Sequence, residues 1–218
     1  MSFGLSRGKT LDTEGYGFDR SDLPDYEDGP FDPRSWFADS SRPFELEIGS
    51  GKGTFLVQQA SLQPDTNFLG IEWAAEFYRY AADRLRRNQC DNVRMLHDDA
   101  VQFVTHRMPD ACCRIVHLYF SDPWPKARHH KRRVVQDASL EQLHRILATE
   151  GLLHLVTDHM DLWAWYESHV ERSAHLFERL PFTPPSSAAE GEVVGTNFER
   201  KYRREGRPFN AMTLRRLP

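Results

Sequence analysis

Cysteine is scarce in this chain, and long apolar runs are absent. Three cysteines occur among 218 residues, and two of them are adjacent, at 112 and 113, so neither a disulfide framework nor a zinc site is expected. No apolar run approaches 18 residues, which argues against a membrane-spanning helix. The first residues lack the apolar core of a secretory signal. We therefore expect a soluble, cytoplasmic protein that holds no metal.

Charge is distributed unevenly, although the formal net charge is only −4. Residues 1–49 contain 11 acidic and 5 basic side chains, whereas the remainder contains 21 acidic and 23 basic side chains. The net charge alone would argue against a nucleic-acid partner. Local clusters decide such binding, however, and the basic clusters lie in the second part of the chain.

The chain divides into an arm and one domain. Residues 1–42 are rich in Gly, Asp, Ser and Pro without apolar periodicity, which predicts an irregular or mobile arm. Residues 43–218 form the expected domain. Its predicted strands are 44–48, 67–73, 93–97, 114–120 and 152–157, its predicted helices are 54–62, 74–88, 100–107, 136–149 (closed by Gly151) and 162–176, and a further strand is expected in the tail. This alternation predicts an α/β fold with a doubly wound, mostly parallel sheet.

A glycine turn follows the first predicted strand. Its spacing, Gly49-x-Gly51-x-Gly53, differs from the GxGxxG of dinucleotide-binding proteins. Glu47 lies two residues before the turn, where a carboxylate would repel a phosphate but would suit a cation. Ligands of doubly wound sheets bind at the carboxyl ends of the strands, so this turn predicts a site for a ligand without phosphate.

Two further acidic positions end the next strands. Glu72 lies 21 residues after Gly51, where a carboxylate accepts ribose hydroxyls, and Asp98 and Asp99 follow the third strand, near an expected adenine. A ribose, an adenine and a cationic group together describe S-adenosylmethionine. NAD fits less well, because its phosphates would face Glu47.

The segment after the fourth strand combines a stiff turn with a basic run. Asp122 is followed by Pro123, Trp124 and Pro125, and the two prolines restrict the backbone. Such a turn would hold a flat base, with Trp124 as a stacking partner. Five Lys or Arg and two His then occur within residues 126–133, without an acid to pair with. This run predicts binding to nucleic-acid phosphates.

These motifs, with Thr157-Asp158 and Thr196-Asn-Phe-Glu199, resemble the bacterial tRNA (guanine-N7-)-methyltransferase family over about residues 44–216. The resemblance implies a Rossmann-like class I methyltransferase with seven strands and an antiparallel C-terminal strand. It also implies S-adenosylmethionine as cofactor, tRNA as partner, and 7-methylguanosine at position 46 of the variable loop as product. No obligatory protein partner is expected.

The resemblance also implies roles for individual residues. Asp122 matches a cofactor-site acid, and charge considerations add a catalytic role, because a carboxylate there would favour the positive charge that guanine acquires. The implied cofactor residues are Glu47, Gly49, Gly51, Glu72, Trp73, Asp99, Ala100 and Asp122. The implied substrate residues are Lys126, Asp158, Thr196, Asn197, Phe198 and Glu199. The implied RNA-binding residues are Arg128, His129, His130, Lys131, Arg132 and Arg133, with His130 at a position where the family often has Asn.

Three alternatives stay open from the residues alone. The methyl acceptor could be an exocyclic amino group of adenine or cytosine in RNA or DNA, since Asp-Pro-Trp-Pro is a distant analogue of the turn in such enzymes. The chain could instead be a non-catalytic RNA-binding protein. A nicotinamide-dependent dehydrogenase fits worst, because no acid/base pair for hydride transfer is evident.

Overall fold

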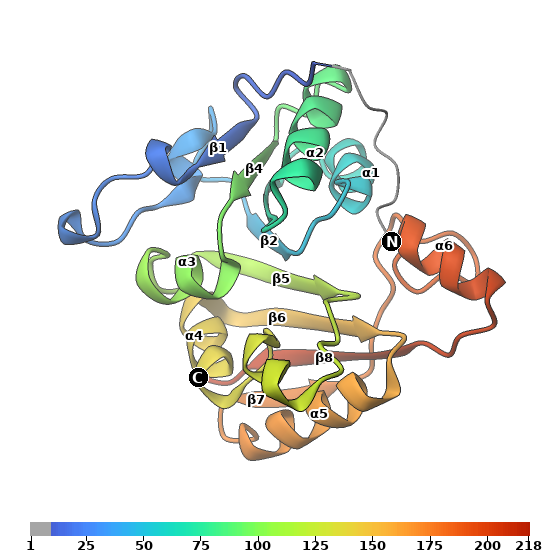
Figure 1. Cartoon of the computed structure of the whole chain (residues 1–218). Coiled ribbons are helices and arrows are strands. Elements are labelled where there is room, and N and C mark those ends of the chain that lie inside the picture. The colour runs from blue at the N-terminus through green and yellow to red at the C-terminus, as the bar shows by residue number, and fades with distance from the viewer. Residues whose placement is uncertain (1–9) are drawn as a thin grey trace.

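The computed structural model describes residues 10–218, and within them eight strands form one sheet (Figure 1). The strands are β1 (Gly17–Asp19), β2 (Phe44–Ile48), β3 (Asn67–Ile71), β4 (Val93–His97), β5 (Cys113–Tyr119), β6 (Leu147–Thr157), β7 (Phe177–Leu180) and β8 (Asn210–Arg216). The α-helices are α1 (Thr54–Leu62), α2 (Ala75–Arg87), α3 (Ala100–His106), α4 (Asp137–Ile146), α5 (Met160–Arg172) and α6 (Asn197–Arg204). Short 3-10 helices occupy Arg20–Asp22, Tyr26–Asp28, Pro33–Trp36 and Ala127–Arg132, and the last is called η4.

The sheet has the order β1-β4-β3-β2-β5-β6-β8-β7. Neighbouring strands from β1 to β6 pair in parallel, whereas β8 is antiparallel to both β6 and β7. From β2 the chain continues to β3 and β4 on one side of the sheet, and it then crosses to β5 and β6 on the other side of β2. Such a switch point opens a ligand crevice at the carboxyl ends of the strands. The predicted α/β, doubly wound class and its antiparallel C-terminal strand are confirmed. The strand β1 adds an eighth member to the predicted seven.

Both faces of the sheet are covered by helices. One apolar cluster contains residues of α1 and α2, among them Phe55 and Leu85. The other contains residues of α3, α4 and α5, among them Phe103, Leu143 and Tyr166. The central strands β2 and β3 are buried along their whole length, as expected for parallel strands enclosed between helix layers. Because helices cover both faces of the sheet, a ligand site is expected in the loops at the carboxyl ends of the strands.

The arm from residue 10 to residue 42 is mostly irregular, yet it joins the sheet. Its strand β1 pairs with β4, with Gly17 opposite Met95. Phe18 stacks on Trp36, with ring centroids 4.1 Å apart. Arg20 donates to the buried carboxylate of Asp98, from Nε to Oδ1 at 2.7 Å. The arm therefore covers the β4 edge, and that pairing depends on contacts that local periodicity does not reveal.

The predicted boundary between the helix over 136–149 and the strand over 152–157 is wrong. The helix ends at Ile146 and β6 already begins at Leu147, so Gly151 lies inside the strand instead of closing the helix. A Cβ at Gly151 would lie 2.8 Å from the carbonyl oxygen of Ala148. The glycine therefore permits a close backbone approach within β6, next to a register shift against β5.

Candidate active site

The turn between β2 and α1 forms the floor of the site. Gly49, Gly51 and Gly53 have φ angles of +78°, +53° and +64°. Residues with a Cβ atom rarely adopt such φ angles, which explains why glycine occupies these three positions. The backbone N–H of Gly49 donates to the carbonyl of Ile71 at 2.8 Å, so the turn is tied to the end of β3. The result is a backbone surface that a ligand can approach closely.

Glu47 lies at the end of β2 and is buried, with 4% of its surface exposed. Its Oε2 atom has no hydrogen-bond partner among residues 10–218. Burial and, to a smaller extent, the charge of Glu72 together raise the pKa of this carboxyl to about 8. A cation placed beside Glu47 would supply the missing partner and favour the ionised carboxylate.

Glu45, two residues earlier on β2, shows the opposite arrangement. It is also buried, but it accepts hydrogen bonds from His117 Nε2 at 2.8 Å and from the guanidinium of Arg114. Burial opposes its ionisation, yet the hydrogen bonds from His117 and Arg114 lower its pKa. The fold therefore satisfies one of two neighbouring glutamates and leaves the other facing the site.

Glu72 connects the end of β3 to the glycine turn. Its carboxylate accepts the N–H of Gly51 and the N–H of Ala74, each at 2.8 Å. Burial raises the pKa of Glu72, and the charge of Asp122 contributes to the rise. Two predicted site acids, Glu72 and Asp122, are thus close enough to interact although 50 residues separate them.

The other predicted cofactor residues follow the ends of β3 and β4. Asp99 accepts the N–H groups of Val101 at 2.9 Å and Gln102 at 3.1 Å, so it caps α3, which begins at Ala100. A carboxylate has room for additional donors, so the cap leaves lone pairs for a ligand. Trp73 has 69% of its surface exposed.

A cavity of about 150 Å³ lies between the glycine turn, the end of β5 and α6. Thr196 and Phe198, predicted as substrate residues, line it together with Glu47 and Gly49. Figure 1 shows α6 beyond the arrowheads of β5 and β6. The remaining lining residues are Ser50, Lys52, Thr54, Phe55, Phe77, Tyr119, Phe120 and Lys201.

Sequence patterns missed most of this lining. Phe77 and Phe55 read as core residues of helices, and Lys201 reads as one of several tail cations. Among the missed residues, only Tyr119 and Phe120 could have been found from the sequence, because they lie at the carboxyl end of a predicted strand, where ligands bind. Glu72, Trp73, Asp99, Ala100 and Asp122 are not part of the cavity wall, so the cavity accounts for one end of the predicted cofactor site.

The turn after β5 carries Asp122, which is exposed. Phe120 and Trp124 on either side of it have φ angles of +54° and +43°. The Trp124 ring stacks on His129, with centroids 5.8 Å apart, and the guanidinium of Arg132 lies 4.8 Å from its centroid. Trp124, expected to stack on a base, is thus already engaged by side chains of its own loop.

The basic run after this turn forms η4, and its members differ in exposure. Lys126, Arg128, Lys131 and Arg132 are exposed, and His129 and His130 are half-buried. Arg133, by contrast, has only 2% of its surface exposed. Its neighbours in the run can reach a phosphate backbone, whereas the Arg133 side chain points into the protein.

The segment before α6 is held by Glu199, which is fully buried. Its carboxylate accepts the N–H groups of Val193, Val194 and Gly195 at 2.5, 2.8 and 2.9 Å, and it pairs with Arg203 at 2.7 Å. Burial opposes its ionisation, but the hydrogen bonds from the Val194 and Val193 N–H groups lower its pKa. Glu199 therefore shapes the loop beside the cavity.

Three further predicted substrate positions are placed by this region. Thr196 caps α6 by accepting the N–H of Glu199 at 3.2 Å, and Asn197 is the first residue of the helix. Asp158 follows β6 and accepts from Arg207 Nη1 at 2.7 Å. The segments after β6 and after α6 are thereby linked next to the site.

The described part of the chain offers two negative findings. In residues 10–218 no three His, Cys, Asp or Glu side chains gather in a way that could hold a metal ion. No helix within the same range has the length and apolar character needed to cross a membrane.

Comparison with known proteins gives a family match over most of the chain. The family described as "Putative methyltransferase" matches residues 41–212. A tRNA (guanine-N(7)-)-methyltransferase of Corynebacterium diphtheriae is 36% identical over 181 residues, which cover 83% of this chain and 70% of that protein. One of the same name from Alkalilimnicola ehrlichii is 37% identical over 166 residues, 75% of this chain and 68% of that protein.

Solved structures share the fold at low identity. The aminoglycoside resistance methyltransferase NpmB1 superposes with a TM-score of 0.55 at 18% identity, over 81% of this chain and 88% of the other. A SAM-dependent methyltransferase from Aquifex aeolicus gives 0.52 at 11% identity, over 80% and 81%. These structures share the fold alone, whereas the relatives above 30% identity show that the chain belongs to the tRNA (guanine-N7-)-methyltransferase family.

Proposed function

We propose that this protein transfers a methyl group from S-adenosylmethionine to N7 of a guanosine in tRNA, at position 46 of the variable loop. The observation that carries the proposal is the unpaired, buried Oε2 of Glu47 on the cavity wall at the glycine turn. A cationic ligand is the partner that such a carboxyl group favours. The named relatives act on guanine N7, which selects the acceptor atom.

The cofactor, when bound, supplies a methyl group on a positively charged sulfur. Glu47 would receive its ammonium group, and the backbone of Gly49 and Gly51 would pass beside it. Glu72 and Asp99 each retain lone pairs for the ribose and the adenine. Trp73 and Ala100 lie next to these two acids in the chain and would border the adenosine.

The guanine side needs orientation more than proton transfer. N7 of neutral guanine already has a lone pair, so no general base is required. Asp122 would accept hydrogen bonds from the N1–H or the amino group of guanine and stabilise the positive charge that the base acquires. Lys126, Asp158, Thr196, Asn197 and Phe198 would border the base and its ribose-phosphate. Glu199 contributes by holding the backbone from Val193 to Gly195.

The backbone of tRNA would lie along η4. Lys126, Arg128, Lys131 and Arg132 are exposed cations, and His129 and His130 lie between them. If four or five cations meet phosphates, log K should fall against log salt with a slope of roughly −3 to −4.5. A cytoplasmic location and action without an obligatory protein partner complete the proposal.

The test is methyl transfer by the purified chain, with no other protein added. Unmodified tRNA and labelled S-adenosylmethionine should yield 7-methylguanosine after digestion to nucleosides. A matched tRNA with adenosine at position 46 should yield none. Methylated adenosine or cytidine as the product would overturn the assignment of N7, and absence of any transfer would overturn the enzymatic role.

A further inference from the structure

The backbone of the turn that carries Asp122 is strained on both sides. Phe120 and Trp124 have φ angles of +54° and +43°, a region that bulky side chains rarely occupy. Such conformations persist only where surrounding contacts impose them. Something outside the turn must therefore hold it, and the contacts of Arg133 are suited to do so.

Arg133 joins the turn to α5. Its Nε donates to the carbonyl oxygen of Pro123 at 2.9 Å, and its Nη2 donates to the carboxylate of Asp161. The guanidinium lies over the Trp165 ring, 4.8 Å from the centroid. The Arg133 side chain thus binds the backbone of the residue after Asp122, and it also contacts two residues of α5.

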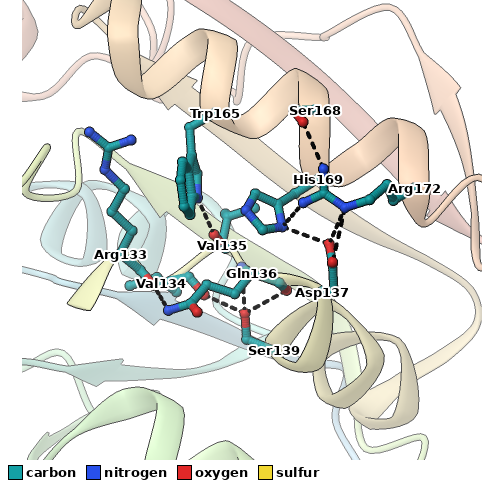
Figure 2. Close-up of polar contacts among 10 residues, drawn as sticks. All are labelled: Arg133, Val134, Val135, Gln136, Asp137, Ser139, Trp165, Ser168, His169 and Arg172. Atoms are coloured by element: carbon teal, nitrogen blue, oxygen red, sulfur yellow. Dashed lines mark hydrogen bonds and ion pairs between the residues drawn. The ribbon is translucent and has the colours of Figure 1, made fainter. Parts of the chain in front are cut away.

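The surroundings of Arg133 are themselves fixed, as Figure 2 shows. Trp165 Nε1 donates to the Val135 carbonyl at 2.7 Å. Gln136 Nε2 donates to the carbonyl of Arg133 at 2.9 Å. It also donates to the carbonyl of Lys131, which Figure 2 does not draw, at the same distance. These bonds set both the backbone from which Arg133 extends and the ring against which it packs.

Stability alone does not explain a guanidinium in this place. Nη1 of Arg133 is buried and has no hydrogen-bond partner among residues 10–218. Its ion-pair partner Asp161 is 59% exposed, so water screens the attraction between the two charges. Apolar side chains of similar volume can often replace a buried charged group without loss of stability. An RNA contact does not explain it either, because the side chain is 1% exposed.

We propose that Arg133 is a positioning residue for methyl transfer. It holds the Pro123 carbonyl and thereby orients the Asp122 carboxylate toward the reacting base, while it contacts neither RNA nor cofactor. This inference rests on the proposed function, since it assumes that Asp122 faces the guanine. It removes Arg133 from the RNA-binding set and leaves its neighbours there.

The test compares Arg133→Met and Arg133→Lys with a chemically matched control. Arg179 also lies over a tryptophan of α5, 5.7 Å from the Trp163 centroid, and pairs with an α5 acid, Glu167, at 3.4 Å. Both Arg133 variants should lose at least tenfold in kcat, with KM for tRNA and Kd for S-adenosylmethionine within twofold. Arg179→Met should retain the wild-type kcat.

Two kinetic outcomes with the Arg133 variants would overturn the inference. A kcat within twofold of the wild type in Arg133→Met would show that the turn keeps its conformation without Arg133. A raised KM for tRNA that the lysine variant restores would show that Arg133 acts as a charge toward RNA. If Arg133→Met does not fold, Asp161→Asn replaces it. The loss of kcat should then be smaller but again without a change in KM, and an unchanged kcat would count against the inference.

A second readout is independent of methyl transfer. With 5-fluorotryptophan incorporated, the Trp124 resonance, assigned through Trp124→Phe, should shift or broaden in Arg133→Met and stay unchanged in Arg179→Met. An unchanged Trp124 signal in Arg133→Met would contradict the positioning role even if no transfer assay succeeds. If the wild type transfers no methyl group while the signal shifts, the proposed function fails and the contact itself stands.

Discussion

Two turns meet at the carboxyl edge of the sheet, and they solve the same geometric problem differently. The turn after β2 takes up positive φ angles with glycines, whereas the turn after β5 does so with Phe120 and Trp124. The glycine turn needs few outside contacts, because its conformation costs little in local strain. The turn after β5 places large side chains at these positions, and we propose that Arg133 and the residues of α5 hold its backbone.

The two turns also differ in their acids. Glu47, beside the glycine turn, is buried and lacks a partner for one oxygen within the described residues. Asp122, on the other turn, is exposed. A buried carboxyl group suits a cation that stays throughout the reaction, and an exposed one suits a base that arrives with RNA. We therefore propose a binding role for Glu47 and a catalytic role for Asp122.

The largest effect is expected from Asp122→Asn. The amide keeps the shape but loses the charge that stabilises the methylated base, so kcat should fall by roughly 10²–10³-fold. Single-turnover methyl transfer to tRNA measures it, and filter binding checks that RNA affinity is retained. An unchanged rate would place the catalytic role elsewhere.

Glu47→Gln should weaken S-adenosylmethionine binding by roughly tenfold or more, since a hydrogen bond to a charged group contributes about 1.5–3 kcal/mol. Calorimetric titration measures the loss. With the wild type, binding at pH 7 should release close to one proton, because a carboxyl with a pKa of about 8 must ionise beside the cation. Titrations in two buffers of different ionisation enthalpy detect that proton, and they should not detect it with the variant.

The same variant should change how the stability of the free protein depends on pH. The pKa of Glu47 is about 8 when folded against a usual value of 4.5, so its contribution is complete below pH 4.5 and is lost as the pH rises to about 8. The full loss would be a few kcal/mol. Glu47→Gln should therefore be more stable relative to wild type at pH 8 than at pH 5. Denaturant unfolding at both pH values would expose a failure of this prediction.

The strain of the two turns can be compared directly by substitution. Gly53→Ala should lower the free energy of unfolding by about 1–3 kcal/mol, because alanine is disfavoured at its φ of +64° and its Cβ would lie 3.1 Å from the Cβ of Ala81. At the other turn, Trp124→Gly should be more stable than Trp124→Ala by about 1 kcal/mol, since both lack the ring and only glycine relieves the backbone. Equal stability of the Trp124 pair would argue against strain at that turn.

The smallest effect is expected from Lys131→Met on the exposed part of η4. Removal of one phosphate contact should reduce the slope of log K against log salt by about 1 and leave kcat unchanged. Binding measured from low to moderate salt provides the slope. A steeper or unaltered slope would mean that Lys131 does not face RNA phosphates.

Much of the fold followed from the sequence, because alternating strands and helices leave few other arrangements. The strands from 44 to 120 and the helices between them lie close to their predicted positions. The exceptions depend on distant partners. β1, which belongs to the arm, is a strand because it pairs with β4. β7 likewise is a strand because it pairs with β8. Gly151 resembled a helix cap but is needed for close packing within β6.

The site shows the same division. Chemical type and strand-end position were sufficient to single out Glu47, Glu72 and Asp122. They could not show that Glu45 is paired while Glu47 is not, or that Arg133 is buried while Arg132 is exposed, because such differences depend on distant partners. Only the tertiary structure decided that His117 and Arg114 satisfy Glu45 while Glu47 is left facing the cavity.

By itself, then, the sequence determined the fold class, the glycine turn, the acids at the strand ends and the basic run, because these depend on local periodicity, backbone freedom and residue type. The tertiary structure decided which charges are paired, buried or free to meet a ligand. That decision belongs to side chains brought together from β2, β5, α5 and α6, whose proximity arises only when the sheet and its helix layers pack.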